Sequence, residues 1–409
     1  MPDDLKPSGK KHHYTTRLSH AGRAGTHVHG FVNLPVHRGS TVLMPTVADR
    51  DAAGAKKFDQ YLSYGAHDNP TLFPLETMIA EIEGGTRAQL YGTGLAAVIM
   101  PLLAYLKSGD HLLMPDSVYG PSRRFANGML AGYGVTTTFF DPTISGTDLL
   151  ALLQPNTRVL YLESPGSHTF EVQDVPALAA VAHGNGTKVL MDNTWGLHHF
   201  QPFQHGVDVS IQALTKYAGG HSDVMLGSVT TNSDEDWHIV RQAAIVLGQT
   251  ASPDDAWLCL RGLRTLAVRM DHQQQSALKV AEFLAQQPEV KQVLYPALPG
   301  APGHAMWKRD FSGAASLFGI ELQPGFSTEQ AYAFANSLEL FGIGASWGGF
   351  ESLVVPTSGE IVRNRPNNQF SGELVRLHIG LEAPDDLIAD LRQGLDVLHT
   401  NSIGLSAAE

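Results

Sequence analysis

Residues 207–223, VDVSIQALTKYAGGHSD, place a lysine at the end of a short apolar run that has the pattern of a buried strand. Lys216 follows Thr215, and Gly219 and Gly220 come soon after it. Removing an ammonium group from water is unfavourable unless the group is paired or neutral. Such a lysine either reaches back to solvent or has a lowered pKa, and only the neutral amine attacks a carbonyl carbon. The polar and flexible neighbours favour the second interpretation, a Schiff-base lysine.

Other apolar runs surround this one and alternate with helical patterns. They are AQLY (88–91), HLLMP (111–115), VTTTFF (135–140), RVLYLES (158–164) and KVLMDNT (188–194). Strands buried on both faces have this appearance, and the alternation predicts a mostly parallel α/β sheet. Ligands of such sheets bind beyond the carboxyl ends of the strands. We therefore expect Glu163, Asp192 and Lys216 to meet at one edge.

The pattern changes twice along the chain and predicts three parts. Residues 1–65 have no strong strand and are expected to form an N-terminal arm that lies over another surface. Residues 66–262 are expected to form the large α/β domain. Residues 263–409 contain Pro/Gly loops, shorter strands and a helical pattern, which predict a smaller C-terminal α+β domain.

Composition excludes several classes of function. The 28 basic and 40 acidic residues give a net charge of −12, so no basic field is available for nucleic acid or an anionic membrane. No stretch approaches the roughly 18 apolar residues of a membrane span, and no apolar signal region opens the chain, so a cytoplasmic protein is expected. Cys259 is the only cysteine, which excludes a disulfide framework. His198 and His199 would point to opposite faces of a strand, so no metal site is expected.

Two features fit a phosphorylated aromatic ring. A carboxylate such as Asp192 keeps a pyridinium nitrogen protonated, although an aspartate here could equally cap the following turn. Residues 90–97, LYGTGLAA, predict a strand, a glycine turn and a helix start, whose backbone amides suit a phosphate group. Many ordinary turns share that pattern, and it lacks the third glycine of a dinucleotide-binding fingerprint.

Tyr119 and Arg376 are two further candidates. Tyr119 follows the run HLLMP and could stack on a flat ring or be an ordinary loop tyrosine. Arg376 lies within LVRLHIG, where a strand arginine needs a partner. That partner could be a substrate carboxylate or a structural acidic side chain.

Together and in this order, these segments resemble the Cys/Met-metabolism family of pyridoxal 5'-phosphate (PLP) enzymes. TKYAGGHSD (215–223) with the upstream DNTW (192–195) is highly specific for the family, and SWGGFESL (346–353) with RLHIGLE (376–382) favours its cystathionine β-lyase branch. The resemblance covers residues 61 to 398. It implies PLP fold type I, like that of aspartate aminotransferase, and β-elimination of L-cystathionine to homocysteine, pyruvate and ammonia.

The resemblance also implies which residues hold the cofactor. Lys216 would carry PLP and act as the main proton shuttle. Asp192 would pair with the pyridine nitrogen, and Tyr119 would stack on the ring. The backbone N–H groups of Gly94 and Leu95 would bind the phosphate.

The remaining implied roles concern the phosphate, the substrate and a second subunit. The Thr215 hydroxyl would assist at the phosphate. Ser346 and Arg376 would bind the carboxylate of a sulfur amino acid, with Trp347 beside it. Tyr64 would reach the phosphate of a neighbouring subunit, which implies at least a dimer and, as is usual in the family, a homotetramer of two dimers.

The chain departs from the family at three positions. Ala66 stands where relatives have a phosphate-binding arginine, and His67, when protonated, or Arg38 are the candidates to replace it. Ala213 replaces a serine, and Ser167 an asparagine. Two rival functions stay open: a γ-acting relative such as cystathionine γ-synthase, cystathionine γ-lyase or methionine γ-lyase, and a non-catalytic PLP-binding protein.

Overall fold

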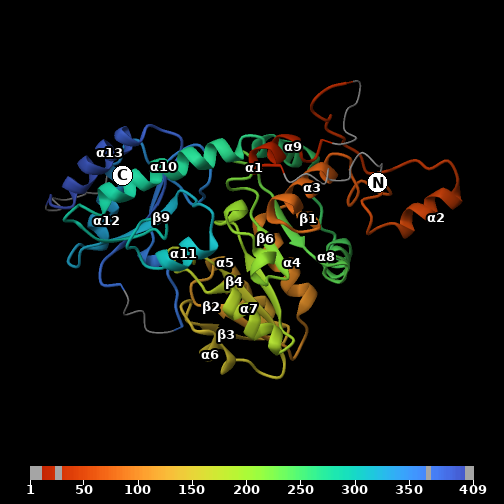
Figure 1. The fold of residues 1–409 in the computed structure, drawn as a ribbon, viewed down its shortest axis with the longest axis horizontal. Coiled ribbons are helices and arrows are strands. Elements are labelled where there is room, and N and C mark those ends of the chain that lie inside the picture. Colours follow the sequence, from red (N-terminus) through yellow and green to blue (C-terminus); the bar gives the residue numbers. More distant parts are fainter. Residues whose placement is uncertain (1–11, 24–29, 365–369, 401–409) are drawn as a thin grey trace, which may run out of the picture.

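The computed structural model describes residues 12–23, 30–364 and 370–400, which contain two β-sheets with helices around each (Figure 1). The larger sheet lies in the middle of the molecule, and the smaller one lies toward the C-terminal end. The long helix α10 (Leu266–Leu284) spans the distance between them. None of the helices in these described ranges is long and apolar enough to cross a membrane.

The larger sheet has seven strands in the order β1-β7-β6-β5-β4-β2-β3. Only β7 runs antiparallel to its two neighbours, and the other pairs are parallel, which confirms the predicted mostly parallel sheet. Its strands are β1 (Arg87–Tyr91), β2 (His111–Pro115), β3 (Thr136–Phe140), β4 (Thr157–Glu163), β5 (Lys188–Asp192), β6 (Val209–Gln212) and β7 (Gly227–Thr231).

Successive side chains of these strands enter two separate hydrophobic cores, one on each face. Leu90 of β1 packs in the core that includes residues of α3 and α7, whereas the next residue, Tyr91, packs in the core that includes residues of α4 and α8. Both faces are thus covered, which explains the nearly continuous apolar runs. The helices of this part are α3 (Leu72–Glu83), α4 (Gly94–Tyr105), α5 (Gly120–Phe125), the π-helical η2 (Ala126–Leu130), α6 (Gly146–Leu150), α7 (Val175–Gly184), η3 (Leu197–His199), η4 (Pro202–His205), α8 (Asp234–Val246) and α9 (Pro253–Leu263).

The smaller sheet has five strands in the order β10-β11-β12-β9-β8. Its pairs are antiparallel except β10 with β11. The elements of this part are β8 (Val290–Leu294), α11 (His304–Asp310), β9 (Leu317–Leu322), α12 (Thr328–Ser337), β10 (Gly342–Ile343), β11 (Leu353–Pro356), η5 (Ser358–Glu360), β12 (Leu374–His378) and α13 (Pro384–Val397).

The segment before α3 extends away from the large sheet, with α2 (Val47–Ala55) at its outer end (Figure 1). The preceding helix, α1 (Tyr14–His20), packs against the rest of the protein. There Arg264 donates hydrogen bonds to the carbonyls of Leu18 and Ala21. The buried side chain of Arg241, in α8, holds the end of this segment next to α3. It donates hydrogen bonds to Asp68 Oδ1 at 2.8 Å and to the His67 carbonyl at 2.9 Å.

The prediction that His198 and His199 lie in a strand, with their side chains on opposite faces, is wrong. The chain leaves the sheet at Asp192, and the two histidines lie in η3, with ring centroids 3.8 Å apart. A tight helical turn does not alternate its side chains as a strand does, so neighbouring rings can meet. Tyr14 of α1 stacks on His198 at 4.1 Å.

Candidate active site

Three polar residues meet at the carboxyl edge of the large sheet, as the strand pattern predicted. Glu163 ends β4, Asp192 ends β5, and the two are direct neighbours in the strand register. Lys216 follows β6, the next strand in the sheet. Parallel strands place their carboxyl ends at one edge, so the order of the sheet brings these groups together.

The amine of Lys216 is removed from most of the solvent and faces the smaller sheet. Its Nζ donates a hydrogen bond to Ser346 Oγ at 2.7 Å and lies 5.1 Å from the centroid of the Trp347 ring. Burial and the positive charge of Arg376 lower the pKa of Lys216 to about 8, against the opposing effect of Asp192. A substantial fraction of this amine is therefore neutral near physiological pH.

Asp192 and Glu163 form a pair of neighbouring carboxyl groups. Burial raises the pKa of Asp192, while the Thr194 hydroxyl and backbone, and then Lys216, oppose the shift. The backbone N–H of Thr194 donates to Asp192 Oδ1 at 3.0 Å, so this aspartate does cap the following turn. Burial, and then the charge of Asp192, raise the pKa of Glu163 well above its usual value. A cation beside Asp192 would relieve both effects.

Glu163 also fixes the position of Tyr119. Its Oε2 accepts a hydrogen bond from the Tyr119 backbone N–H at 2.8 Å, just before α5. The Tyr119 ring stays partly exposed. Burial raises the pKa of its hydroxyl, and the charges of Asp192 and Glu163 act in the same direction. The Tyr119 hydroxyl is thus near enough to Asp192 and Glu163 to feel their charges.

The start of α4 provides backbone donors beside the lysine loop. Thr93 caps the helix by accepting from the Ala96 N–H at 3.0 Å, so the N–H groups of Gly94 and Leu95 have no partner within the helix. A Cβ on Gly94 would lie only 2.6 Å from the Cβ of Ala213. This close approach requires glycine, and it places the positive end of the helix next to the loop that leads to Lys216.

The hydroxyl of Thr215 is engaged within the fold. It donates to the Leu226 carbonyl at 3.2 Å and accepts from the Leu226 N–H at 3.0 Å. To donate to a phosphate, the hydroxyl hydrogen would have to turn away from the Leu226 carbonyl, while the oxygen could still accept from the Leu226 N–H. The expected role of Thr215 therefore requires the exchange of one hydrogen bond.

Arg376 is a buried cation that no acidic side chain of the described ranges neutralises by a salt bridge. It is 7% exposed, and its NH2 atom donates toward the carbonyl oxygens of Gly344, Ala345 and Ser346 at 3.1–3.2 Å. Burial lowers its pKa, and the charges of Glu360 and Tyr119 oppose the shift. The guanidinium keeps donors for a bound carboxylate, which favours the ligand interpretation over the structural ion pair.

Tyr64 and its neighbours do not join this cluster in the described chain. Tyr64 is half exposed and forms a single bridge with Thr41. Burial, and then the charge of Arg241, lower the pKa of His67, which disfavours the protonated form that a phosphate contact would need. Arg38 is turned toward Asp254, with Nε donating to Oδ2 at 2.9 Å.

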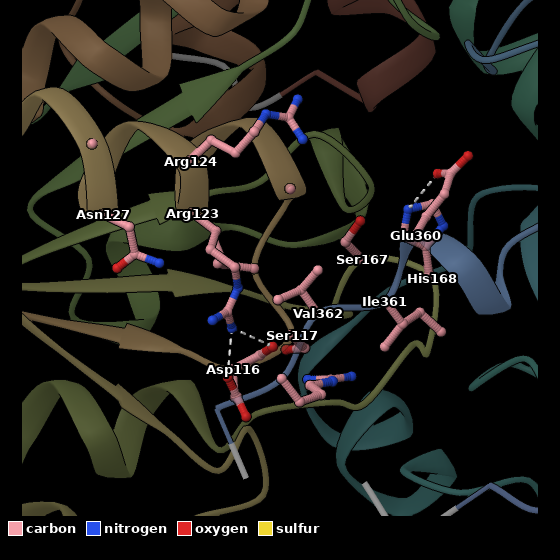
Figure 2. Close-up of a pocket in the computed structure, with 14 residues that line it drawn as sticks. Asp116, Ser117, Arg123, Arg124, Asn127, Ser167, His168, Glu360, Ile361 and Val362 are labelled. Atoms are coloured by element: carbon pink, nitrogen blue, oxygen red, sulfur yellow. Dashed lines mark hydrogen bonds and ion pairs between the residues drawn. The ribbon is translucent and has the colours of Figure 1, made fainter. Parts of the chain in front are cut away.

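A cavity of about 420 Å³ opens beside Tyr119, between the start of α5 and residues 360–363 (Figure 2). Within it, Arg123 turns toward Asp116, whereas Arg124 points the other way. Glu360 Oε2 lies 3.3 Å from His168 Nε2, and burial together with the charges of Arg376 and Arg363 lowers the pKa of His168 to about 4. The cavity thus holds the acidic side chain of Glu360 beside a neutral histidine, and Arg124 also lines it.

The donors at this edge match a ring that carries a phosphate, a carbonyl and a basic nitrogen. Helix amides suit the phosphate, the Lys216 amine suits the carbonyl, and the raised pKa of Asp192 would fall beside a protonated ring nitrogen. PLP has these three groups, so the residues present fit it.

Comparison with known proteins agrees with this chemistry. The sequence model described as "Cys/Met metabolism PLP-dependent enzyme" matches residues 15–396. The chain belongs to this family. It is 43% identical to "Cystathionine beta-lyase MetC" of Escherichia coli K12, over 93% of this chain and 97% of that protein. It is 44% identical to "Putative cystathionine beta-lyase" of Rhizobium johnstonii, over 93% and 95%. The crystal structure of metB from Corynebacterium glutamicum superposes with a TM-score of 0.87 at 31% identity, covering 95% of this chain and 99% of that one.

Some residues of the site were not assigned a role from sequence. The contact from Glu163 to the Tyr119 backbone joins the end of β4 to a residue 44 positions away, and only the placement of Glu163 at a strand end hinted at it. Gly348 lies on the backbone of Lys216, where a Cβ would be 3.0 Å from the lysine Cα. A Gly-Gly pair after Trp347 was the one local signal for that approach.

The lowered pKa of Lys216 predicts how the apoprotein takes up PLP. Only the neutral amine attacks the aldehyde, so the rate constant for uptake should rise with pH and reach half its maximum near pH 8. Stopped-flow absorbance of apoprotein mixed with PLP, with Nα-acetyl-lysine as the control amine, measures this profile. A midpoint for the protein near the ordinary lysine value of about 10.4 would contradict the geometry described above.

Proposed function

We propose that this protein catalyses PLP-dependent β-elimination of L-cystathionine, giving homocysteine, pyruvate and ammonia. The observation that supports it most is the pairing of a low-pKa lysine with a buried arginine that has no acidic partner among the described residues. These two groups meet the needs of an α-amino acid, whose α-proton must be removed while its carboxylate is held. The similarity to cystathionine β-lyases along nearly the whole chain supports L-cystathionine as the substrate.

The cofactor would be held by the groups that fit it. The Gly94 and Leu95 amides would bind the phosphate, Asp192 would face the ring nitrogen, and Tyr119 would cover the ring. When bound, PLP supplies an electron sink that stabilises negative charge at the substrate α-carbon. Asp192 would strengthen this effect because a carboxylate keeps the ring nitrogen protonated.

Lys216 would carry out the proton transfers. Its Nζ would take the proton from the substrate α-carbon as a general base, which requires a pKa near the working pH. Ser346 Oγ, 2.7 Å away, would direct the amine, and Arg376 would orient the substrate carboxylate through the guanidinium donors that the loop does not use. Expulsion of the β-substituent as a thiolate would complete the elimination.

The cavity beside Tyr119 would receive the leaving half of the substrate. The leaving half of L-cystathionine ends in a second α-amino acid group, which carries one positive and one negative charge. Glu360 and Arg124, which both line the cavity, offer the complementary charges (Figure 2). A γ-acting relative would use the same lysine, aspartate and arginine, so these residues alone do not separate the two reactions.

The assembly would be a homotetramer of two dimers in the cytoplasm. Residues 1–65 would contact a neighbouring subunit, residues 66–262 would form the large PLP-binding domain, and residues 263–409 would form the smaller C-terminal domain. The described part of the first segment exposes several large apolar side chains, which a neighbour would cover. They are Phe31, Val32, Leu43 and Val47, each more than 60% exposed. Tyr64 would then reach the phosphate bound by that neighbour.

Replacing the lysine tests the proposed chemistry. Lys216→Ala should abolish the visible absorbance of covalently held PLP and lower the cystathionine-cleaving rate by several orders of magnitude, because both the attachment and the base are lost. Lys188→Ala, a half-buried lysine at the opposite end of β5, is the matched control and should keep both. Normal turnover by Lys216→Ala would reject the assignment.

Replacing the buried arginine tests the carboxylate site. Arg376→Leu should lower kcat/KM for cystathionine by an amount equivalent to about 1.5–3 kcal/mol, because a charged hydrogen bond to the substrate is lost. The thermal midpoint should fall only by as much as the lost bonds to the carbonyls of residues 344–346 account for, since no ion pair to the described residues is broken. Arg158→Leu, at the opposite edge of the large sheet, serves as the control. A large loss of stability with unchanged kinetics would show a structural role instead.

A further inference from the structure

The buried side chain of His378 holds the loop that carries Ser346 and Trp347. His378 ends β12, two positions after Arg376, so both side chains leave the same face of the strand. The histidine is completely buried. Its Nε2 accepts a hydrogen bond from the Gly348 backbone N–H at 2.9 Å, and its Nδ1 lies 3.0 Å from the carbonyl oxygen of Glu351.

These two partners fix the protonation of the imidazole. A backbone N–H only donates and a carbonyl only accepts, so Nε2 carries no hydrogen and Nδ1 does. Burial, and then the positive charges of Arg376 and Lys216, lower the pKa of His378 to about 3, against the effect of the Glu351 carbonyl. His378 is therefore neutral, in a single tautomer, at any pH where the protein works.

Gly348, the residue that His378 holds, lies on the backbone next to Lys216. Its φ is +86°, and a Cβ there would lie 2.7 Å from the Tyr217 nitrogen and 3.0 Å from the Lys216 Cα. Both facts require glycine. The bond from Gly348 to His378 thus fixes the loop at the point where it touches the chain that carries the lysine.

Two residues of β12 hold different parts of the loop that carries Ser346 and Trp347. Arg376 contacts its first part through the carbonyls of residues 344–346, and His378 holds the second part through Gly348 and Glu351. Ser346 is the last residue of the first part, two positions before Gly348. Its Oγ is thereby placed 2.7 Å from Lys216 Nζ.

We propose that His378 is a positioning residue, which acts through Gly348 to hold Ser346 Oγ against the amine of Lys216. This inference rests on the proposed role of Lys216. Without the contact to Gly348, the loop can move away from the lysine and the proton transfer slows. Arg376 would still hold the substrate carboxylate, so kcat should fall more than KM rises.

Two amide side chains separate the two bonds of the ring. In His378→Gln, the longer side chain can bring its amide oxygen to the place of Nε2, so the Gly348 N–H keeps an acceptor. In His378→Asn, the shorter side chain can donate to Glu351 but does not reach Gly348. Each variant loses one buried hydrogen bond, so their thermal midpoints should fall by similar amounts.

The kinetic result should differ between these matched variants. For the PLP-loaded protein acting on cystathionine, His378→Asn should lower kcat roughly ten- to hundredfold and change KM less than about threefold. His378→Gln should keep both constants within about threefold of the parent. Equal losses of kcat in the two variants would overturn the proposal.

The pH profile of PLP uptake gives a readout that does not depend on turnover. Ser346 Oγ accepts from the Lys216 amine and favours its charged form, so losing this contact lowers the lysine pKa. The uptake midpoint should move to lower pH, by roughly half a unit, in His378→Asn and stay in place in His378→Gln. An unchanged midpoint in the asparagine variant would contradict the proposed route.

A double-variant cycle tests whether His378 acts through Ser346. Ser346→Ala combined with His378→Asn should lower kcat no more than the larger single loss, whereas additive losses would overturn the inference. If His378→Asn does not fold, His378→Gln alone decides: parental kcat and midpoint support the role, and a tenfold fall in kcat rejects it. Turnover by Lys216→Ala would instead defeat the proposed function itself.

Discussion

The Nζ of Lys216 lies 2.7 Å from Ser346 Oγ, partly removed from water, between the positive charge of Arg376 and the negative charge of Asp192. A lysine amine in water is charged and inert toward carbonyl groups, so the site must keep this one dry and near cations. That requirement explains why Arg376 is buried without an acidic partner in the described ranges. A carboxylate supplied by the protein at this point would raise the lysine pKa again.

The large sheet meets this requirement by placing three loops at one edge. Behind that edge, a completely buried carboxylate, Glu83 at the end of α3, ties β5, β6 and β7 together. Burial raises its pKa, and the hydrogen bonds that it accepts oppose the shift. The donors are Asn193 at 3.4 Å, Gln212 at 2.8 Å, and Ser210 and Thr230, both at 2.5 Å. The strands that lead to Asp192 and Lys216 therefore keep a fixed relation.

Sequence patterns predicted the parallel strands well because each is apolar on both faces. They missed β7 as a separate strand, since GSVTT buries hydroxyl groups in place of apolar ones, and Thr230 donates to Glu83. Asp192, Lys216 and Glu163 were predicted to meet because each ends a strand. Gly348 meets the lysine loop across more than 100 positions, and His378 of the smaller sheet holds Gly348 from 30 positions further along the chain, so no local pattern encodes either contact. The proposed partner of Tyr64 belongs to another subunit, so one chain does not reveal it.

The arrangement around Lys216 is expected to perform β-elimination and not γ-elimination on a thioether amino acid. The most direct measurement is the identity of the keto acid that the purified, PLP-loaded protein releases from L-cystathionine. Cleavage on the β side gives pyruvate and homocysteine, whereas cleavage on the γ side gives 2-oxobutyrate and cysteine. The account predicts pyruvate and homocysteine in equal amounts. Release of 2-oxobutyrate as the main keto acid would contradict it.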